Sequence, residues 1–279
     1  MEFIRQYYFD FGLMGDYFSP VLDGFWLTVQ LSILGGIFSL IWGLILAVVR
    51  QLPGRATAPL RWLSIGYIDA FRGIPLLLVL LLVSGGLSAL SSPVGGDVIP
   101  EFLGKPTWLG QTSPFWYGVL ALTITYGAYM AEVYRAGIEA VPRGQMEAAR
   151  SVGMSHGQAM RFVIVPQAVR KVIPPLLNDF IALMKDTSLV SILGAAEVVY
   201  VGRQVQSETF NGSALMLGAI MFLIVTIPLA RLVDYLIARD QSKTQRSGKP
   251  ADDGPDDDVT GFQAPGLPPT SGTGGGVGV

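Results

Sequence analysis

Residues 142–166 read PRGQMEAARSVGMSHGQAMRFVIVP and form the longest polar interval in the hydrophobic body of the chain. Pro142 suits a first helical turn, where a missing N–H costs nothing, and Gly153 suits the left-handed residue just past a helix end. Ser155 and Gln158 have the spacing of a capping box, which starts a second helix. The stretch therefore predicts two short helices joined by a glycine hinge, held as a stiff projection between membrane spans.

The same stretch carries an ordered set of residues. Residues 147–149, Glu-Ala-Ala, are followed after three residues by Gly153, and nine residues later by Val163-Ile-Val-Pro166. This order resembles the EAA motif of ABC importer permeases, with valine in place of the consensus isoleucine and leucine before the proline. Pro166 cannot continue a helical hydrogen-bond ladder, so we expect a boundary near the far end of the second helix.

The resemblance implies that residues 138–167 are a cytoplasmic coupling loop, which seats in a groove of a separate ATP-binding subunit. The residue types suit that role. Ala148 and Ala149 are small enough for a partner to approach closely, Glu147 offers a charge-assisted acceptor, and Gly153 sets the angle between the two helices. The predicted ATPase-coupling residues are Glu147, Ala148, Ala149, Gly153 and Pro166.

The composition is typical of a membrane protein. The 279 residues are 51% hydrophobic and 14% charged, with a mean hydropathy of +0.48. The lack of cysteine excludes disulfides, and the single His156 cannot build a histidine metal site. The sequence contains no G-x-x-x-x-G-K-[ST] loop to hold the phosphates of ATP. We therefore expect a transport subunit with no catalytic residue and no cofactor of its own, and a partner that binds ATP and Mg.

Long apolar segments predict an all-α polytopic membrane protein with about five transmembrane helices, and the resemblance implies a fold like that of a type I ABC importer permease. Residues 1–23 are aromatic, which predicts a segment at the external lipid interface. Residues 241–279 are rich in Asp, Gly and Pro, which predicts a disordered cytoplasmic tail. The expected spans of the permease domain, residues 24–240, are 24–49, 66–90, 115–137, 168–194 and 213–237.

Small residues on two of these segments predict close helix packing. Gly35, Gly36, Ser39 and Gly43 give the first span a face that another helix can approach. The string Ser84-Gly85-Gly86, in the second span, is interpreted in the same way.

Two pairs of opposite charges stand three residues apart within apolar segments. Asp69 and Arg72 can meet on one helix face, and so can Glu132 and Arg135. Charges in a membrane are costly unless they are paired. Both pairs are therefore predicted to be ion pairs near the cytosolic ends of their helices.

Three further strings resemble the polar amino-acid branch of ABC permeases: DAFRGIPLL at residues 69–77, YGAYMAEVYRAGI at 126–138 and KDTSLVSILG at 185–194. In the first, Ile74 departs from the usual threonine. The resemblance implies transport of a polar amino acid delivered by an external solute-binding protein.

Polar groups within these apolar runs are candidates for the substrate path. Lys185 beside Asp186 would be expensive between apolar residues unless paired or hydrated, so this string is expected beside a cavity or a helix break. The candidates for the substrate path or for a structural polar role are Arg72, Tyr126, Glu132, Asn178, Lys185, Asp186, Thr187 and Ser188.

The positive charges predict an orientation. If the spans alternate from an external N-terminus, 15 of the 19 basic residues fall on one side. The positive-inside rule then places residues 138–167 and the C-terminus in the cytosol and the N-terminus outside. We expect this arrangement in a bacterial cytoplasmic membrane.

Five spans are few for enclosing a substrate path, so pairing with a second copy or a sister permease is expected. The other expected partners are a dimer of cytoplasmic ABC ATPase subunits, an external solute-binding protein, an amino acid and the lipid bilayer, with no nucleic acid. An ion-coupled secondary transporter or channel is the alternative and would need no ATPase, although no inverted repeat supports it. A purely structural anchor is disfavoured by the intramembrane polar strings.

Overall fold

The computed structural model describes residues 2–247, and the regular elements in this range are helices, without a strand. The predicted all-α class is confirmed. The chain divides into two units after Asp240. Of the second unit only residues 241–247, which are helical, are described, so the tail predicted for residues 241–279 lies outside the described residues from 248 onward.

Two short helices, α1 (Glu2–Tyr8) and α2 (Phe11–Asp16), precede the long helix α3 (Phe18–Arg50). Asp10 caps α2, because its side chain accepts hydrogen bonds from two backbone N–H groups of the first turn. α3 has 33 residues and is apolar enough to cross a membrane.

The segment predicted as the second span is two helices. α4 (Ala58–Gly73) and α5 (Leu76–Leu90) are bent by 110° at the break between them. Ile74 has a φ of −88° and a ψ of 129°, because the residue before a proline is kept out of the helical region. Pro75 in turn has no N–H to continue the ladder. The span predicted for residues 66–90 is therefore broken at Ile74 and Pro75 into two helices.

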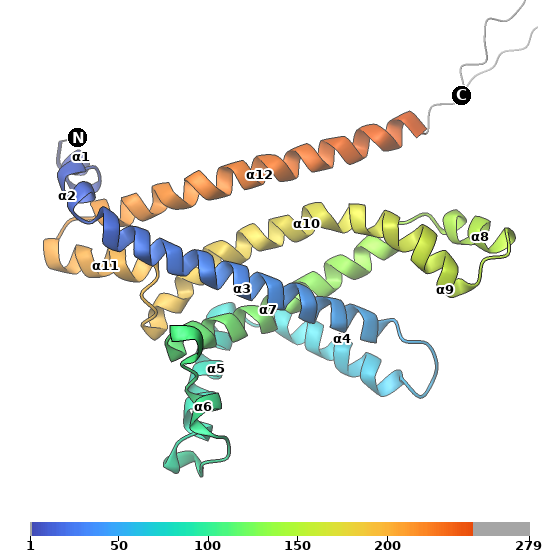
Figure 1. Cartoon of the computed structure of the whole chain (residues 1–279), viewed down its shortest axis with the longest axis horizontal. Helices are drawn as coiled ribbons and strands as arrows, with labels where there is room; N and C mark the ends of the chain where they lie inside the picture. Colours follow the sequence, from blue (N-terminus) through green and yellow to red (C-terminus); the bar gives the residue numbers. More distant parts are fainter. Residues whose placement is uncertain (1, 248–279) are drawn as a thin grey trace, which may run out of the picture. The chain divides into compact units, whose positions relative to one another are not determined.

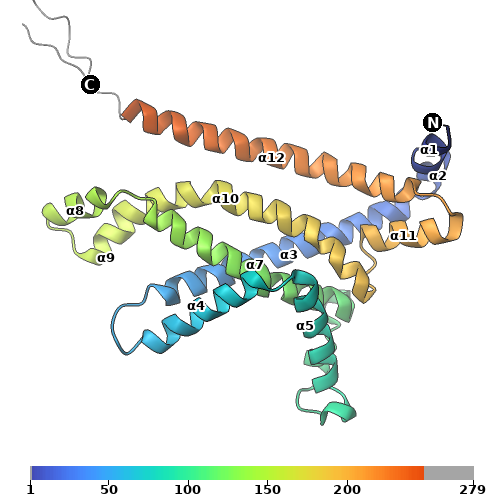
Figure 2. The ribbon, with the colours of Figure 1, turned by 180° about the vertical axis from the view of Figure 1, so that it is seen from behind.

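α5 extends away from the other helices together with α6 (Glu101–Gly104), as both views show (Figure 1, Figure 2). Two short 3₁₀ turns, η1 (Pro93–Gly95) and η2 (Trp108–Gly110), complete the connection. The chain then enters α7 (Ser113–Glu139), which contacts α3, α4, α5 and α10. α7 is thus the helix around which the others are arranged.

Close packing of α3 on α7 depends on small residues, as predicted. A Cβ at Gly43 would lie 2.9 Å from the carbonyl oxygen of Gly127, and one at Gly35 would lie 3.3 Å from the side chain of Leu122. Ser39 lies on the same face, and its hydroxyl donates to the carbonyl of Leu122 at 3.2 Å. The two backbones approach closely because these side chains are short.

Gly36 also allows close packing, but against α10, where a Cβ would lie 2.9 Å from the ring of Phe180. The packing role predicted for Ser84-Gly85-Gly86 is not found within this chain. Among the described residues nothing lies within 4 Å of a Cβ built at Gly85 or Gly86, because α5 turns this face away from the other helices.

The central stretch forms α8 (Arg143–Ser151), α9 (His156–Ala159), a π-helical turn η3 (Met160–Ile164) and α10 (Val165–Asp186). Pro166 lies in the first turn of α10 and does not end a separate helix. The N–H of Val165 bonds to the carbonyl of Met160, one residue further back than in an α-helix. The missing N–H of Pro166 is harmless in a first turn, so α9, η3 and α10 follow one another without a loop.

The last elements are η4 (Thr187–Leu193), α11 (Val198–Thr209) and α12 (Ser213–Ser247). Among residues 2–247, two helices are long and apolar enough to cross a membrane, Phe18–Arg50 and Ser213–Arg239, or three if the bent pair α4 and α5 is one span. α7 and α10 do not meet that test. The count of five spans therefore remains a prediction.

Candidate functional site

A polar cavity of about 420 Å³ lies at the break between α4 and α5, against α7 and α10. The break places backbone and side chains of residues 72–76 on one wall, and α7 and α10 supply the others. It is lined by Arg72, Gly73, Ile74, Pro75, Leu76, Thr125, Tyr126, Tyr129, Asp179, Ala182 and Asp186. One guanidinium and two carboxylates thus meet in one space.

Two polar atoms of this wall have no hydrogen-bond partner among residues 2–247. They are Oγ1 of Thr125 and Oδ2 of Asp179, and both are buried. Buried polar groups in proteins are almost always paired, so an unpaired hydroxyl and carboxylate oxygen in one cavity call for a partner from outside the chain. The cavity is therefore suited to a small polar molecule.

The other charged groups of the cavity are held by tyrosines. The hydroxyl of Tyr126 donates to Oδ2 of Asp186 at 2.8 Å. The guanidinium carbon of Arg72 lies 5.8 Å from the ring centroid of Tyr129, a cation–π contact, while the Tyr129 hydroxyl donates to the carbonyl of Arg72 at 3.2 Å. Both tyrosines therefore orient a charged group without neutralising it.

The ion pair predicted between Asp69 and Arg72 is wrong. No ion pair joins them in the described structure, and Asp69 is exposed, whereas Arg72 faces the cavity. Three predicted candidates do come together in the cavity, namely Arg72, Tyr126 and Asp186.

Asp179 was missed by sequence reasoning, which favoured its neighbour Asn178. Asn178 is exposed and does not line the cavity. The spacing of Asp179 and Asp186 was the available signal, because seven residues are two helical turns and place both carboxylates on one face of α10. Asn178 is rotated by about 100° from that face.

The string at residues 185–188 separates at the end of α10. Lys185 is exposed and Asp186 lines the cavity, so the two charges point apart. Thr187 is fully buried, and its hydroxyl donates to the carbonyl of Met184 at 2.7 Å. The carbonyl of Ser188 accepts from the hydroxyl of Ser191 at 2.6 Å. Thr187 and Ser188 thus shape the change from α10 to η4.

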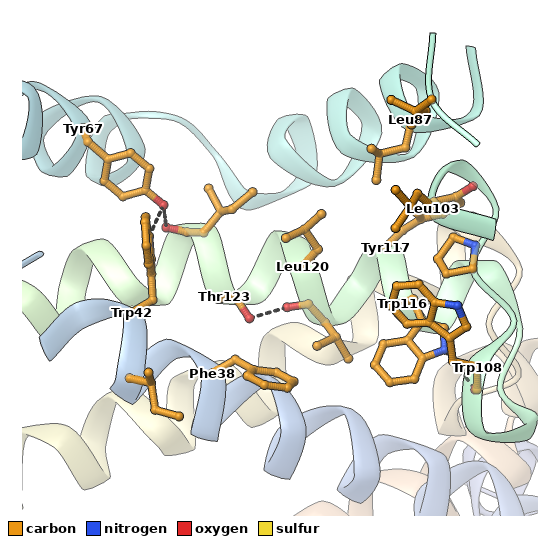
Figure 3. Close-up of a pocket in the computed structure, with 15 residues that line it drawn as sticks. Phe38, Trp42, Tyr67, Leu87, Leu103, Trp108, Trp116, Tyr117, Leu120 and Thr123 are labelled. Carbon is orange, nitrogen blue, oxygen red and sulfur yellow. Dashed lines mark hydrogen bonds between the residues drawn. The ribbon is translucent and has the colours of Figure 1, made fainter. Parts of the chain in front are cut away.

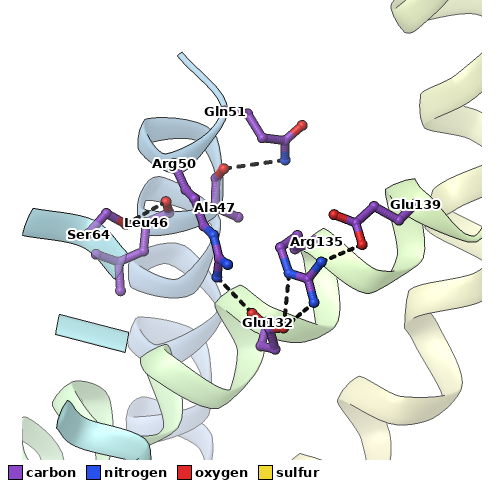
Figure 4. Close-up of polar contacts among 8 residues, drawn as sticks. All are labelled: Leu46, Ala47, Arg50, Gln51, Ser64, Glu132, Arg135 and Glu139. Atoms are coloured by element: carbon purple, nitrogen blue, oxygen red, sulfur yellow. Dashed lines mark hydrogen bonds and ion pairs between the residues drawn. The ribbon is translucent and has the colours of Figure 1, made fainter. Parts of the chain in front are cut away.

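Glu132 lies in a separate charge cluster, shown in Figure 4, and not in the cavity. One of its oxygens accepts from Arg50 at 2.9 Å, and the other accepts from Arg135, which also pairs with Glu139. The predicted pair of Glu132 and Arg135 is confirmed, with Arg50 of α3 as an additional partner. The cluster ties the ends of α3 and α7 together.

An apolar cavity of about 800 Å³ lies between α3, α4, α5, α6 and α7 (Figure 3). Aromatic side chains line it, among them Phe38, Trp42, Trp108 and Trp116. Its few polar groups are already used, because Nε1 of Trp42 donates to the hydroxyl of Tyr67 at 2.9 Å. A charged solute would lose its hydration there without compensation, so this cavity is not the candidate site.

Glu197, between η4 and α11, is fully buried against α3. Its carboxylate accepts from the backbone N–H of Tyr200 at 2.8 Å and lies 3.5 Å from the hydroxyl of Thr28. Burial without a cation raises the pKa of Glu197 to about 7, which the N–H and hydroxyl donors partly offset. Within residues 2–247 no group of three His, Asp or Glu side chains is placed to hold a metal ion.

The central stretch has the hinge that its sequence predicts. Gly153 has a φ of +87°, its N–H bonds to the carbonyl of Arg150 at 3.0 Å, and the next N–H, that of Met154, reaches the carbonyl of Ala149 at 3.2 Å. These two bonds form a Schellman motif. The capping box of Ser155 and Gln158 is present.

The surface predicted for the coupling residues needs one correction. Glu147 and Ala148 are exposed, but Ala149 is buried, with 5% of its surface accessible. Ala149 faces inward because it is one helical step from Ala148, on the side of α8 that packs toward η3. It supports the two-helix projection from within and is not part of its outer surface.

A family model described as "Binding-protein-dependent transport system inner membrane component" matches residues 39–241 of this chain. The chain belongs to this family. The permease is 36% identical to the probable glutamine ABC transporter permease protein GlnM of Bacillus subtilis, over 81% of this chain and 96% of that protein. It is 35% identical to the glutamate transport system permease protein GluC of Corynebacterium glutamicum, over 78% of this chain and 92% of that protein.

Solved structures agree. A chain in the crystal structure of an amino acid ABC transporter with histidines has a TM-score of 0.70 and 34% identity, and the match covers 82% of the permease and 98% of that chain. A chain of the inward-facing MetNI methionine ABC transporter has a TM-score of 0.58 at 20% identity, with 79% of the permease and 98% of that chain covered, and supports the fold alone. The permease is the membrane subunit of an amino-acid ABC importer, with the type I importer fold.

Proposed function

We propose that the polar cavity is the point on the translocation path where the permease holds its amino acid. Every amino acid carries an α-ammonium and an α-carboxylate. Arg72 pairs with the carboxylate, and the free Oδ2 of Asp179 accepts from the ammonium. The observation that carries this proposal is the buried, unpartnered oxygen of Asp179 in a cavity that also contains a guanidinium.

The charge of the cavity favours some side chains over others. Arg72 and Asp179 match the two α groups, which leaves Asp186 as an additional carboxylate that only Tyr126 contacts. A substrate with an acidic side chain would add a further carboxylate beside Asp179 and Asp186, and like charges at short range repel one another. We therefore assign neutral or basic polar amino acids to the cavity.

The proposal includes the partners of an ABC importer. A dimer of separate ATPase subunits binds ATP and Mg, since this sequence has no P-loop, and a solute-binding protein delivers the amino acid. A second permease copy or a sister permease completes the path. The basic residues favour an external N-terminus and a cytosolic two-helix projection.

The projection docks on the ATPase through the exposed surface of α8. Glu147 offers a carboxylate acceptor, and Ala148 leaves room for a close partner surface. Gly153 fixes the angle of α8 to α9 through its left-handed backbone. The inward Ala149 has a supporting role only.

Binding to the cavity is tested with the purified permease and radiolabelled amino acids, without ATPase or binding protein. Arg72→Gln and Asp179→Asn should each weaken binding about tenfold to a hundredfold, which is less than for a fully buried charge pair because Arg72 is exposed and Asp179 is partly buried. Asp69→Asn is the matched control, because Asp69 lies one turn from Arg72, is exposed and does not line the cavity. Unchanged binding in both cavity variants would rule out this site.

Docking is tested by co-purification of the ATPase and by substrate-stimulated hydrolysis in vesicles. Ala148→Arg and Gly153→Val should release or uncouple the ATPase, by steric block and by misdirection of α9 respectively, while the cavity still binds the amino acid. Gly157→Ala in α9 is the control, because a Cβ there meets nothing within 4 Å. Continued uptake without any ATPase would instead support the ion-coupled alternative.

A further inference from the structure

A second, apolar groove of about 570 Å³ lies at the other end of the bundle, between the end of α3, the end of α7 and the run from α9 to α10. It is lined by Leu44, Ala47, Val48, Gln51, Leu52, Pro53, Tyr134, Ile138, His156, Met160, Val165, Ala168, Val169 and Val172. Neither the proposed transport path nor the docking surface of α8 uses this groove.

The groove opens on the surface of α3, which is apolar enough to span a membrane. Val48 of α3 is 55% exposed and Val169 of α10 is 46% exposed, so aliphatic carbon lies at the opening. Two of the polar lining residues are turned to the backbone: Gln51 donates to the carbonyl of Ala47 at 3.3 Å, and the Tyr134 hydroxyl to that of Leu40 at 3.4 Å. The floor therefore offers hydrocarbon to its occupant.

Basic residues stand on the chain segments that line one end of the groove. Arg61 donates through Nη1 to the carbonyls of Leu52 and Gly54, both at 2.7 Å, which places its guanidinium beside the groove-lining Leu52. Arg55 belongs to the same α3–α4 loop and is exposed. His156 lines the groove itself. Arg161 follows the lining residue Met160 in the chain, is exposed, and has its guanidinium carbon 5.6 Å from the ring centroid of Phe162.

No carboxylate neutralises this basic rim in the described part of the chain. Arg55, Arg61 and Arg161 have no acidic partner within 4.0 Å. The acidic residues of the adjacent end of α7, Glu132 and Glu139, are already held by Arg50 and Arg135. An apolar groove with a net positive rim at one end matches an amphiphile with an anionic head.

We propose that this groove is a binding site for an anionic phospholipid, with one acyl chain along α3 and α10 and the phosphate at Arg55, Arg61 and Arg161. Apolar surface of a membrane helix is covered by hydrocarbon, and basic pockets between such helices select anionic head groups. The leaflet depends on the orientation in the proposed function, and the lipid would be cytosolic. The site itself depends only on the groove and its rim.

The site also places a lipid against the elements that carry the two-helix projection. His156 and Met160 belong to α9 and η3, and Val165 begins α10, so an acyl chain in the groove contacts the run that links the projection to the polar cavity. Beside the larger apolar cavity near Trp108, Lys105 precedes the lining residue Pro106, but its ammonium lies 3.5 Å from the carboxylate of Glu101 and is already paired.

The test is native mass spectrometry of the full permease in detergent, titrated with phosphatidylglycerol or phosphatidylcholine of identical acyl chains. The wild type should retain phosphatidylglycerol about tenfold better, an increment of about 1.4 kcal/mol. Arg55→Gln combined with Arg161→Gln should reduce this preference to about twofold or less. Arg143→Gln combined with Arg150→Gln, which removes the same charge from α8, should preserve the tenfold preference.

Filling the groove tests the acyl-chain part separately. Val169→Trp and, as an independent variant, Val48→Trp should weaken retention of both lipids about tenfold, because each places an indole in the groove. If the α8 control and the rim variant lost the preference for phosphatidylglycerol equally, the preference would come from the overall surface charge. That result would overturn the proposal. A structure in lipid with a helix of a second copy in the groove would overturn it too. Neither measurement requires ATPase or amino acid, so failure of the transport proposal leaves both readouts interpretable.

Discussion

Two pairs of opposite charges with the same spacing in the sequence have opposite outcomes in the structure. Glu132 and Arg135 form an ion pair that Arg50 extends. Arg72 lines a cavity with two carboxylates and forms no ion pair with Asp69 or with any other residue in the described part of the chain. Charges satisfied within the chain hold helices together, whereas charges left unpaired at a cavity are available to a substrate.

We expect the largest effect on transport from a substitution in the polar cavity. Asp179→Asn should lower amino-acid uptake about tenfold to a hundredfold, because the ammonium loses its anionic acceptor. The same change should leave thermal stability unchanged or slightly raised, since it removes the charge from an unpaired buried oxygen. Uptake in vesicles and melting in detergent measure the two outcomes. A destabilised variant with normal uptake per folded molecule would assign Asp179 to the scaffold.

A substitution in the charge cluster of Glu132 should have the reverse result, a loss of stability with little change in uptake. Glu132→Gln leaves Arg50 and Arg135 without their shared carboxylate, and stability should fall by about 1–3 kcal/mol, between the values for exposed and buried pairs. Uptake per folded molecule should change little. Combining it with Arg50→Gln should recover part of the loss in a melting experiment, because one orphaned charge is then removed.

Glu197 is a third kind of charged group, a buried carboxylate that accepts hydrogen bonds from neutral donors. We expect its substitution to have a smaller effect on stability. Its pKa is raised to about 7, so between its ordinary value and about 7 the folded protein binds more protons than the unfolded chain. Stability should therefore fall as the pH rises through this window and be constant above it. Glu197→Gln should abolish that slope in melting temperature measured from pH 5 to pH 8. A parallel slope in the variant would show that another group titrates.

Asp69→Asn should have the smallest effect, within about 0.5 kcal/mol of the wild type, as expected for an exposed residue without an ion pair. Melting temperature and uptake should both match the wild type. A loss of uptake would mean that Asp69 and Arg72 meet in a conformation that transport requires.

Features with a local cause could be predicted from the sequence. The hinge at Gly153 and the capping box at Ser155 follow from backbone conformation and short-range hydrogen bonds. The close packing at Gly35 and Gly43 needs only small residues on one helix face. Three of the candidate residues that the family strings indicated, Arg72, Tyr126 and Asp186, line one cavity.

Features decided by distant contacts could not be predicted in this way. The break at Ile74 and Pro75 turns Arg72 toward α10, and no spacing within α4 records that direction. Ala149 is buried only because α8 packs against η3. Asp179 becomes notable only when its seven-residue separation from Asp186 is combined with the position of Arg72.

η3 runs into α10 without a loop, so one continuous helical segment joins the two-helix projection to the polar cavity. From Val165 to Asp179 the helix rises by ~21 Å, so α10 connects the two-helix projection at one end with the carboxylate of Asp179 near the other. Pro174 and Pro175 interrupt its hydrogen-bond ladder between those points. In the proposed function we therefore expect force applied to α8 to reach Asp179 as a bend at the proline pair rather than as a rigid rotation of the whole helix.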